Sequence, residues 1–202
     1  MPRITTGPST SGTLTDVLPQ PSRSLEWAKQ AGIVVGASLV VALCARVTLP
    51  LPGTPVPLTL QNFGVLAVAL TLGSRRGFAA LALYLAEGAA GLPVFSPSIL
   101  GGGIAQILGP TGGFLMAYPL VAFVAGWIYE RTSRRFGWAA LAGLAGEIVL
   151  FAGGLGWLFV LTHSFAQAMK LGLYWFLSAE VIKIMLAAGA ASGWTRRFQR
   201  AG

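Results

Sequence analysis

Long apolar stretches with few charged residues constrain the fold of this chain more than any other feature. A helix needs roughly 17–25 mostly apolar residues to cross the hydrocarbon layer of a membrane. Six stretches meet this requirement, so the sequence predicts an all-α, polytopic protein of the cell (inner) membrane with six transmembrane helices. We place these helices at residues 31–49, 58–74, 77–94, 113–129, 138–161 and 169–194.

Composition excludes the other broad classes. Charged residues make up 10% of the 202 residues, whereas a soluble domain carries about 25%. Disordered chains are rich in charge and poor in apolar residues, which is the reverse of this composition. The formal net charge of +8 would indicate nucleic acid only if the basic residues lined one face of a soluble domain. They lie between the apolar stretches instead, so we predict a lipid environment and no nucleic-acid partner.

The basic residues favour one orientation in the membrane. Loops rich in Lys and Arg stay on the cytoplasmic side, and a cytoplasmic N-terminus places eleven of the fourteen Lys and Arg residues there. We therefore predict that the N- and C-termini are both cytoplasmic. The eleven residues are Arg3, Arg23, Lys29, Arg75, Arg76, Arg131, Arg134, Arg135, Arg196, Arg197 and Arg200.

This topology divides the chain into three segments. We expect a flexible cytoplasmic tail at 1–29, a six-helix substrate-binding domain at 30–195 and a basic cytoplasmic tail at 196–202. The first 25 residues are rich in Ser, Thr and Pro and lack the apolar stretch and cleavage site of a signal peptide, so we expect this tail to be retained.

The connections on the predicted outer side differ in character. The first, at 50–61, carries four prolines within eight positions, which exclude regular helix and favour a stiff, extended cover. The second, at 95–112, holds two glycine clusters that suit either a flexible loop or a loop folded over a ligand. A phosphate-binding loop needs Lys and then Ser or Thr after its last glycine, but Phe114 and Leu115 follow here. The third connection, at 162–167, is short.

The sequence offers little for metal or covalent chemistry. Cys44 and His163 are each the single residue of their type, so neither can join a multi-cysteine or multi-histidine metal site. No set of nucleophile, base and orienting acid is recognisable. We therefore expect no metal, no cofactor and no enzymatic activity.

Ionisable residues inside the spans are the strongest indication of function. Placing such a side chain at the bilayer centre costs about 2.5–3.5 kcal/mol of insertion free energy unless it is paired or faces a cavity. Glu180 and Lys183 lie three residues apart on one helix face and can pair. The pair either neutralises itself for insertion or presents an acceptor and a donor to a polar ligand. Glu87 is predicted to reach the same depth, whereas Glu147 lies nearer the cytoplasmic side and is interpreted as a helix-packing or loop-bonding residue.

Four ordered motifs resemble the BioY family, the biotin-specific substrate-capture (S) subunits of energy-coupling factor (ECF) transporters. The motifs are PVPLTLQ at 55–61, LGSRRG at 72–77, YLAEGAAGLPVF at 84–95 and LGPTGG at 108–113. The resemblance covers about residues 30–195. It implies a six-helix protein that binds biotin from outside beneath the first and second outer connections. The protein would pass biotin inward with a transmembrane coupling subunit and ATP-hydrolysing subunits.

The resemblance also implies a binding site. In this family an acidic residue and a Lys three positions later on the last helix contact the vitamin, and here these are Glu180 and Lys183. We expect Glu180 to accept from a ureido N–H and Lys183 to donate to the ureido oxygen, with Glu87 or Tyr84 completing the cluster. The remaining expected contacts are Thr59, Gln61, the backbone N–H groups of Gly112 and Gly113, and the aromatic walls Tyr118 and Trp175.

A stripe of small residues on the first predicted helix is a candidate contact for the coupling subunit. Ala28, Gly32 and Gly36 recur every four residues, which lets another helix backbone approach closely. S subunits present a similar face, so Gly32 and Gly36 are expected at this interface, with packing inside the chain as the alternative.

Other functions and assemblies stay open at this level. They are an S subunit for another vitamin, a proton-coupled carrier that relies on Glu87 and Glu147, and a small intramembrane enzyme that uses Glu180 and Lys183. The chain could also form a homo-oligomer.

Overall fold

The computed structural model describes residues 23–98 and 101–200, with side chains described through residue 194. The first part of the predicted tail and the side chains of Arg196, Arg197 and Arg200 lie outside the described residues. The elements in chain order are α1 (Arg23–Arg46), β1 (Thr48–Leu49), β2 (Leu58–Thr59), α2 (Gln61–Leu72), α3 (Ser74–Ala89), α4 (Gly103–Leu108), α5 (Gly112–Glu130), α6 (Phe136–Thr162), α7 (Phe165–Gly172) and α8 (Leu177–Arg200).

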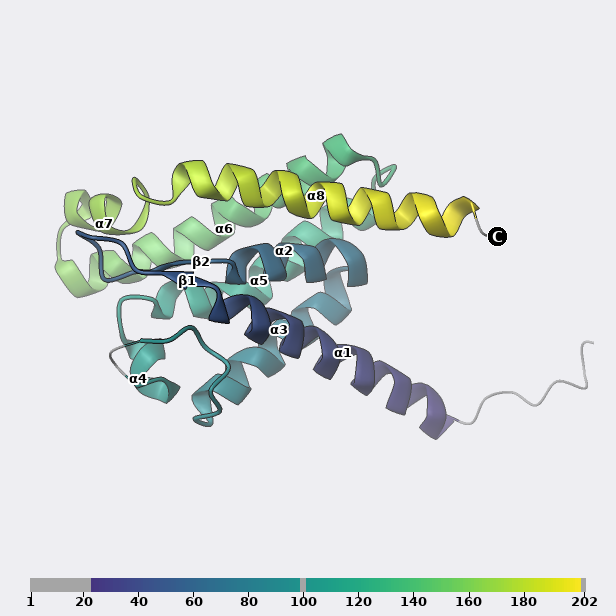
Figure 1. The fold of residues 1–202 in the computed structure, drawn as a ribbon, viewed down its shortest axis with the longest axis horizontal. Coiled ribbons are helices and arrows are strands. Elements are labelled where there is room, and N and C mark those ends of the chain that lie inside the picture. The colour runs from purple at the N-terminus through teal and green to yellow at the C-terminus, as the bar shows by residue number, and fades with distance from the viewer. Residues whose placement is uncertain (1–22, 99–100, 201–202) are drawn as a thin grey trace, which may run out of the picture.

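The long helices form an elongated bundle around α2. The start of α1 and the end of α8 lie at one end, and the β1–β2 hairpin, α4 and α7 lie at the other (Figure 1). Helix α2 packs against α1, α3, α5 and α8, and eight of its twelve residues are buried. The outer helices expose large apolar side chains, such as Leu43 on α1 and Ile148 on α6. These surfaces are compatible with lipid, which is as apolar as the side chains themselves.

Fewer helices reach membrane-spanning length than the sequence predicts. Three qualify by length and hydropathy, namely α1, α5 and α6, and the bent pair α7–α8 is a fourth candidate. Helix α2 has 12 residues and α3 has 16, which at 1.5 Å per residue fall short of a hydrocarbon layer about 30 Å thick. The described chain is thus mostly helical with three or four candidate spans, and the count of six remains a prediction.

Helices extend beyond both predicted domain boundaries. Helix α1 begins at Arg23, inside the segment predicted as a flexible tail, because residues 23–30 favour helix although they are not apolar. Glu26 lies in the first turn, where the helix dipole favours an acid, and pairs with Lys29 at 3.0 Å. At the other end, α8 continues to Arg200, past the predicted boundary at 195. The sequence prediction followed hydropathy alone and therefore missed both extensions.

The connections contain more regular structure than predicted. The proline-rich connection contains no helix, as expected, and it turns at 52–53. Its flanking residues pair as an antiparallel ladder with Thr48 opposite Thr59, so the chain is not purely helical. The glycine-rich connection contains α4. The predicted last span is broken: α7 ends at Gly172, α8 begins at Leu177, and the two helices are bent by 51° relative to each other.

Candidate functional site

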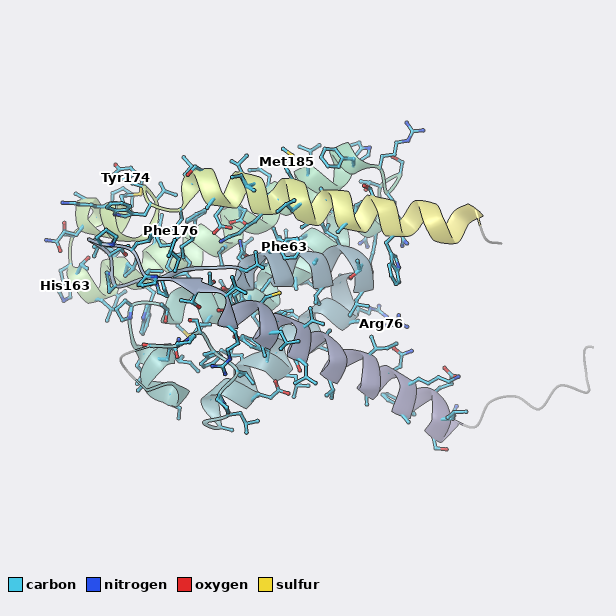
Figure 2. All side chains as sticks on the ribbon, in the orientation of Figure 1. Phe63, Arg76, His163, Tyr174, Phe176 and Met185 are labelled. Atoms are coloured by element: carbon cyan, nitrogen blue, oxygen red, sulfur yellow. The ribbon has the colours of Figure 1, made fainter. Side chains whose placement is uncertain are left out.

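A cavity of about 50 Å³ lies beneath the hairpin, between α2, α5, α6 and α8. Its wall is part apolar and part polar. The apolar lining is Val56, Pro57, Phe114, Leu115, Leu150, Phe151 and Phe176, and the polar lining is Thr59, Gln61, Asn62, Ser96, Thr111, Tyr118, Glu180 and Lys183. Figure 2 shows Phe176 beside the hairpin, whereas Tyr174, two residues earlier, lies at the outer edge.

A buried charged network forms one side of this cavity. Lys183 Nζ donates to Glu180 Oε1 at 2.6 Å, and both side chains are over 90% buried. Asn62 Nδ2 donates to Glu180 Oε2 at 2.6 Å and to Glu147 Oε1 at 2.5 Å. One amide on α2 thus ties together carboxylates from α6 and α8. The network holds two carboxylates and one ammonium group, which pairs with Glu180, so it is rich in acceptors.

A second polar chain supports the opposite side. Gln61 Nε2 donates to the Tyr84 hydroxyl at 2.9 Å, and this hydroxyl donates to the carbonyl of Val94 at 3.0 Å. Gln106 Nε2 donates to the carbonyl of Ser96 at 3.1 Å. These bonds tie residues 94–96, which follow α3, to Tyr84 of α3 and Gln106 of α4, and Tyr84 in turn holds Gln61 of α2. The position of the polar wall is therefore set by side chains from three separate elements.

The hairpin closes the cavity from the loop end. Thr54 Oγ1 donates to the carbonyl of Leu171 at 2.6 Å, which ties the hairpin to α7. Val56 packs with Leu158, Ala168 and Phe176 in a small apolar cluster. Among the described residues, this hydrogen bond, this apolar cluster and the ring of Trp175 against Gly53 fasten the cover.

Five predicted site residues line this cavity: Glu180, Lys183, Thr59, Gln61 and Tyr118. Tyr84 lies one layer behind, where its hydroxyl holds Gln61. The structure therefore gathers six predicted residues from five elements in one place.

The other predicted site residues lie elsewhere. Glu87 accepts a hydrogen bond from Ser38 of α1 at 3.2 Å and does not line the cavity. Trp175 is 41% exposed and its ring lies against Gly53, because the turn before α8 points Phe176 inward in its place. A Cβ on Gly112 would collide with the carbonyl of Ile107, and one on Gly113 would collide with α6 at Gly153 and Trp157. These two glycines serve close packing.

Neither Asn62 nor a link between Glu147 and Glu180 was predicted from the sequence. Asn62 is the next residue after the PVPLTLQ motif, and an amide at the start of an apolar helix was an available signal. The sequence prediction interprets Glu147 as a helix-packing or loop-bonding residue away from Glu180, whereas in the structure Asn62 of α2 bonds to both carboxylates. The break after α7 starts α8 inside the bundle, so the first turn of α8 lies at the depth of the middle of α6.

Comparisons with known proteins support one family. The BioY family pattern matches residues 17–200. The biotin transporter BioY of Thermotoga maritima is 37% identical over 149 residues, which are 74% of this chain and 85% of that protein. The probable biotin transporter BioY of Pyrococcus horikoshii is 36% identical over 161 residues, which are 79% of this chain and 92% of that protein.

One solved structure shares the fold. The crystal structure of an S-component for biotin from an ECF-type ABC transporter matches with a TM-score of 0.75 at 23% identity. The match covers 85% of this chain and 93% of that one.

Proposed function

Because the chain belongs to the BioY family, we propose that it captures biotin at the outer face of the cell membrane. It then delivers biotin inward as the S subunit of an ECF transporter. The chain is a multi-pass membrane protein and not an enzyme. The observation that carries the proposal is the buried Glu180–Lys183 pair beside an apolar cavity that the proline-rich hairpin covers.

The cavity matches the chemistry of biotin group by group. The ureido ring has two N–H donors and one carbonyl acceptor, which suit Glu180 and Lys183. Asn62 Oδ1 is buried and has no hydrogen-bond partner among the described residues, so it is free to accept the second ureido N–H. Tyr118 and Phe176 supply walls for the apolar sulfur ring. Thr59 and Thr111 then remain for the carboxylate tail.

The cover must move for biotin to enter. The cavity volume of about 50 Å³ is far below the roughly 300–1,000 Å³ of sites for drug-sized ligands. The hairpin is the wall with the fewest attachments, since the other walls are helices packed within the bundle. We infer that it swings away from α7 to admit biotin and closes over it.

Replacing Thr54 with Val should speed the dissociation of biotin roughly threefold to tenfold. The change removes the hydrogen bond to Leu171, which contributes about 0.5–1.5 kcal/mol. It also removes the acceptor of the Val56 backbone N–H inside the hairpin. Stopped-flow or surface plasmon resonance measurements on the purified protein give the rate. Thr71→Val is the control, because the Thr71 hydroxyl bonds only within its own helix. Equal rates in both variants would contradict the role of the hairpin as a cover.

We propose six spans with both termini cytoplasmic, in which the short helices α2 and α3 complete the bundle. The described basic loops support this orientation. Figure 2 shows Arg76 and His163 toward opposite ends of the molecule. The first turn of α3 and the loop between α5 and α6 carry five arginines at the end away from the hairpin, as expected for a cytoplasmic side.

Coupling is proposed to use α1. Gly32 and Gly36 are exposed, and a Cβ on either would meet nothing within 4 Å. No described residue packs against these two positions, which supports a contact with another protein. The open stripe suits a helix of the coupling subunit.

Replacing Gly36 with Leu should weaken co-purification with the coupling subunit at least about tenfold, while the Kd for biotin stays within about twofold. A bulky side chain blocks close approach of helix backbones. Gly156→Leu on α6 is the matched control, since its Cβ also meets nothing within 4 Å. Loss of partner binding in both variants would contradict an interface that is specific to α1.

One binding experiment tests the function directly. Calorimetry of the purified chain should give stoichiometric binding of biotin and no binding of thiamin or riboflavin, which excludes an S subunit for those vitamins. Uptake by cells should stop when the partner ATPases are inactivated. Collapse of uptake with the proton gradient alone would indicate a secondary carrier, and turnover of biotin by the isolated chain would indicate an enzyme. Light scattering of the same sample gives the oligomeric state.

A further inference from the structure

A second cavity lies at the end of the molecule away from the hairpin, between the α2–α3 turn and the end of α5. Its volume is about 430 Å³, and its lining includes Ser74, Arg75, Arg76, Tyr129, Glu130 and Arg134. This volume falls in the range typical of ligand sites, roughly 300–1,000 Å³. None of these residues belongs to the biotin site described above.

The cavity carries unbalanced positive charge. Both oxygens of Glu130, the acid in its lining, accept from Ser74, at 3.0 Å from the backbone N and 2.7 Å from Oγ. The ion pairs among the described side chains are Lys29–Glu26 and Lys183–Glu180, so no described acid pairs with the three arginines. Three guanidinium groups thus line the cavity together with one carboxylate, whose oxygens are already hydrogen-bonded to Ser74. Guanidinium forks recognise phosphate oxygens in bidentate fashion.

The walls of this cavity are held in place. The Tyr129 hydroxyl donates to the carbonyl of Arg134 at 2.8 Å, and Arg134 has a φ of +52°. A non-glycine residue in this region is strained and persists only where its surroundings impose it. Gly73 has a φ of +81°, and a Cβ there would collide with the carboxylate of Glu130. The arginines are therefore presented by a fixed turn and a fixed loop.

An apolar surface continues from the cavity along α3 and α5. Phe78 and Phe123 meet edge to face with ring centroids 6.4 Å apart, and each is 41% exposed. Phe78 lies one turn along α3 from Ser74. Trp127, one turn along α5 from Phe123, stacks with Arg131 at 4.2 Å, an arrangement suited to the membrane interface. A basic cavity directly above exposed aromatic rings matches a phosphate headgroup with acyl chains below it.

We propose that this cavity binds the phosphate group of an anionic phospholipid, with its acyl chains over Phe78 and Phe123. Basic pockets between transmembrane helices recognise such headgroups. The adjoining apolar surface of Phe78 and Phe123 favours a lipid over free phosphate or an acidic protein surface. The bound lipid fastens the α2–α3 turn to the end of α5.

Native mass spectrometry of the full chain in detergent tests the proposal, with phosphatidylglycerol as the probe and phosphatidylcholine as the neutral comparison. The test variant is Arg75→Gln, Arg76→Gln and Arg134→Gln together. The matched control, Arg23→Gln, Lys29→Gln and Arg135→Gln, removes the same charge from the same end but outside the cavity. If the test variant is unstable, Arg75→Gln with Arg76→Gln leaves the strained loop intact. An unchanged Kd for biotin reports an intact fold.

Each basic residue near an anionic surface contributes about 1 kcal/mol, or roughly fivefold in affinity. The test variant should therefore bind phosphatidylglycerol at least about tenfold more weakly than the wild type, while the control stays within about threefold. Equal loss in both variants would overturn the proposal in favour of a diffuse charge effect. Displacement of the lipid by equimolar inorganic phosphate would overturn it in favour of a free-phosphate site. Normal lipid binding with lost co-purification of the coupling subunit would assign the arginines to a protein contact.

Discussion

Replacing Lys183 with Met should weaken biotin binding by roughly 10- to 150-fold. A hydrogen bond to a charged group contributes about 1.5–3 kcal/mol, and this substitution removes the ammonium donor proposed for the ureido oxygen. It also removes the ammonium group that pairs with the buried carboxylate of Glu180 at 2.6 Å. A buried charge that has lost its ionic partner destabilises the site further. Glu180→Gln should weaken binding by a similar factor, because it removes the charged acceptor for a ureido N–H.

Calorimetry of variants in lipid nanodiscs measures this effect. Lys170→Met is the matched control, because Lys170 is exposed on α7 at the same end of the molecule. Glu26→Gln is the acidic control, since Glu26 lies at the far end of α1 and pairs with Lys29. The double variant Glu180→Gln with Lys183→Met removes both charges and should fold normally while binding biotin weakly. Unchanged affinity in Lys183→Met would place the biotin site elsewhere.

Replacing Asn62 with Asp should lower both stability and biotin affinity. The two side chains have nearly the same shape, but Asp brings a third carboxylate to positions 2.5 and 2.6 Å from Glu147 and Glu180. Removing the partner of a buried charge costs about 3–5 kcal/mol, and like charges in contact should cost at least as much. A loss of about 3 kcal/mol lowers the unfolding midpoint by roughly 6–12 °C in a chain of this length.

The double variant Asn62→Asp with Glu147→Gln separates electrostatics from shape. The amide introduced on α6 can donate to the carboxylate introduced on α2, which restores one donor between the two helices. We expect this variant to recover most of the midpoint, as measured by thermal unfolding in detergent. Asn62→Asp with Glu147→Leu offers no donor and should not recover it. If Asn62→Asp alone unfolds at the wild-type temperature, the bridge of Asn62 is not a significant contributor to stability.

Local features of the site could be predicted from the sequence. Glu180 and Lys183 are three residues apart on a helix, so their pairing follows from helix geometry alone. Thr59 and Gln61 belong to the PVPLTLQ motif, so the resemblance to the BioY family was enough to expect them at the site. These inferences needed no knowledge of how the helices pack.

Contacts between distant segments could not be predicted in the same way. Asn62 and Glu147 are 85 residues apart, and their meeting depends on how α2 packs beside α6. Trp175 and Phe176 are adjacent aromatic residues, and only the turn before α8 selects which one faces the cavity. Glycines that approach a ligand and glycines that approach a helix look alike in sequence, which is why Gly112 and Gly113 were expected at the site although they pack against neighbouring backbone.

Hydropathy, proline geometry and helix spacing are local properties, so the order of amino acids was enough to predict the lipid environment, the extended cover and the Glu180–Lys183 pair. The packing of the helices was needed to learn that α2 is short and buried, that α7 and α8 are separate, and that Asn62 joins two carboxylates. These outcomes depend on which helix faces meet. Apolar side chains in a membrane protein give no local signal of that choice, since lipid and neighbouring helices accept the same residues.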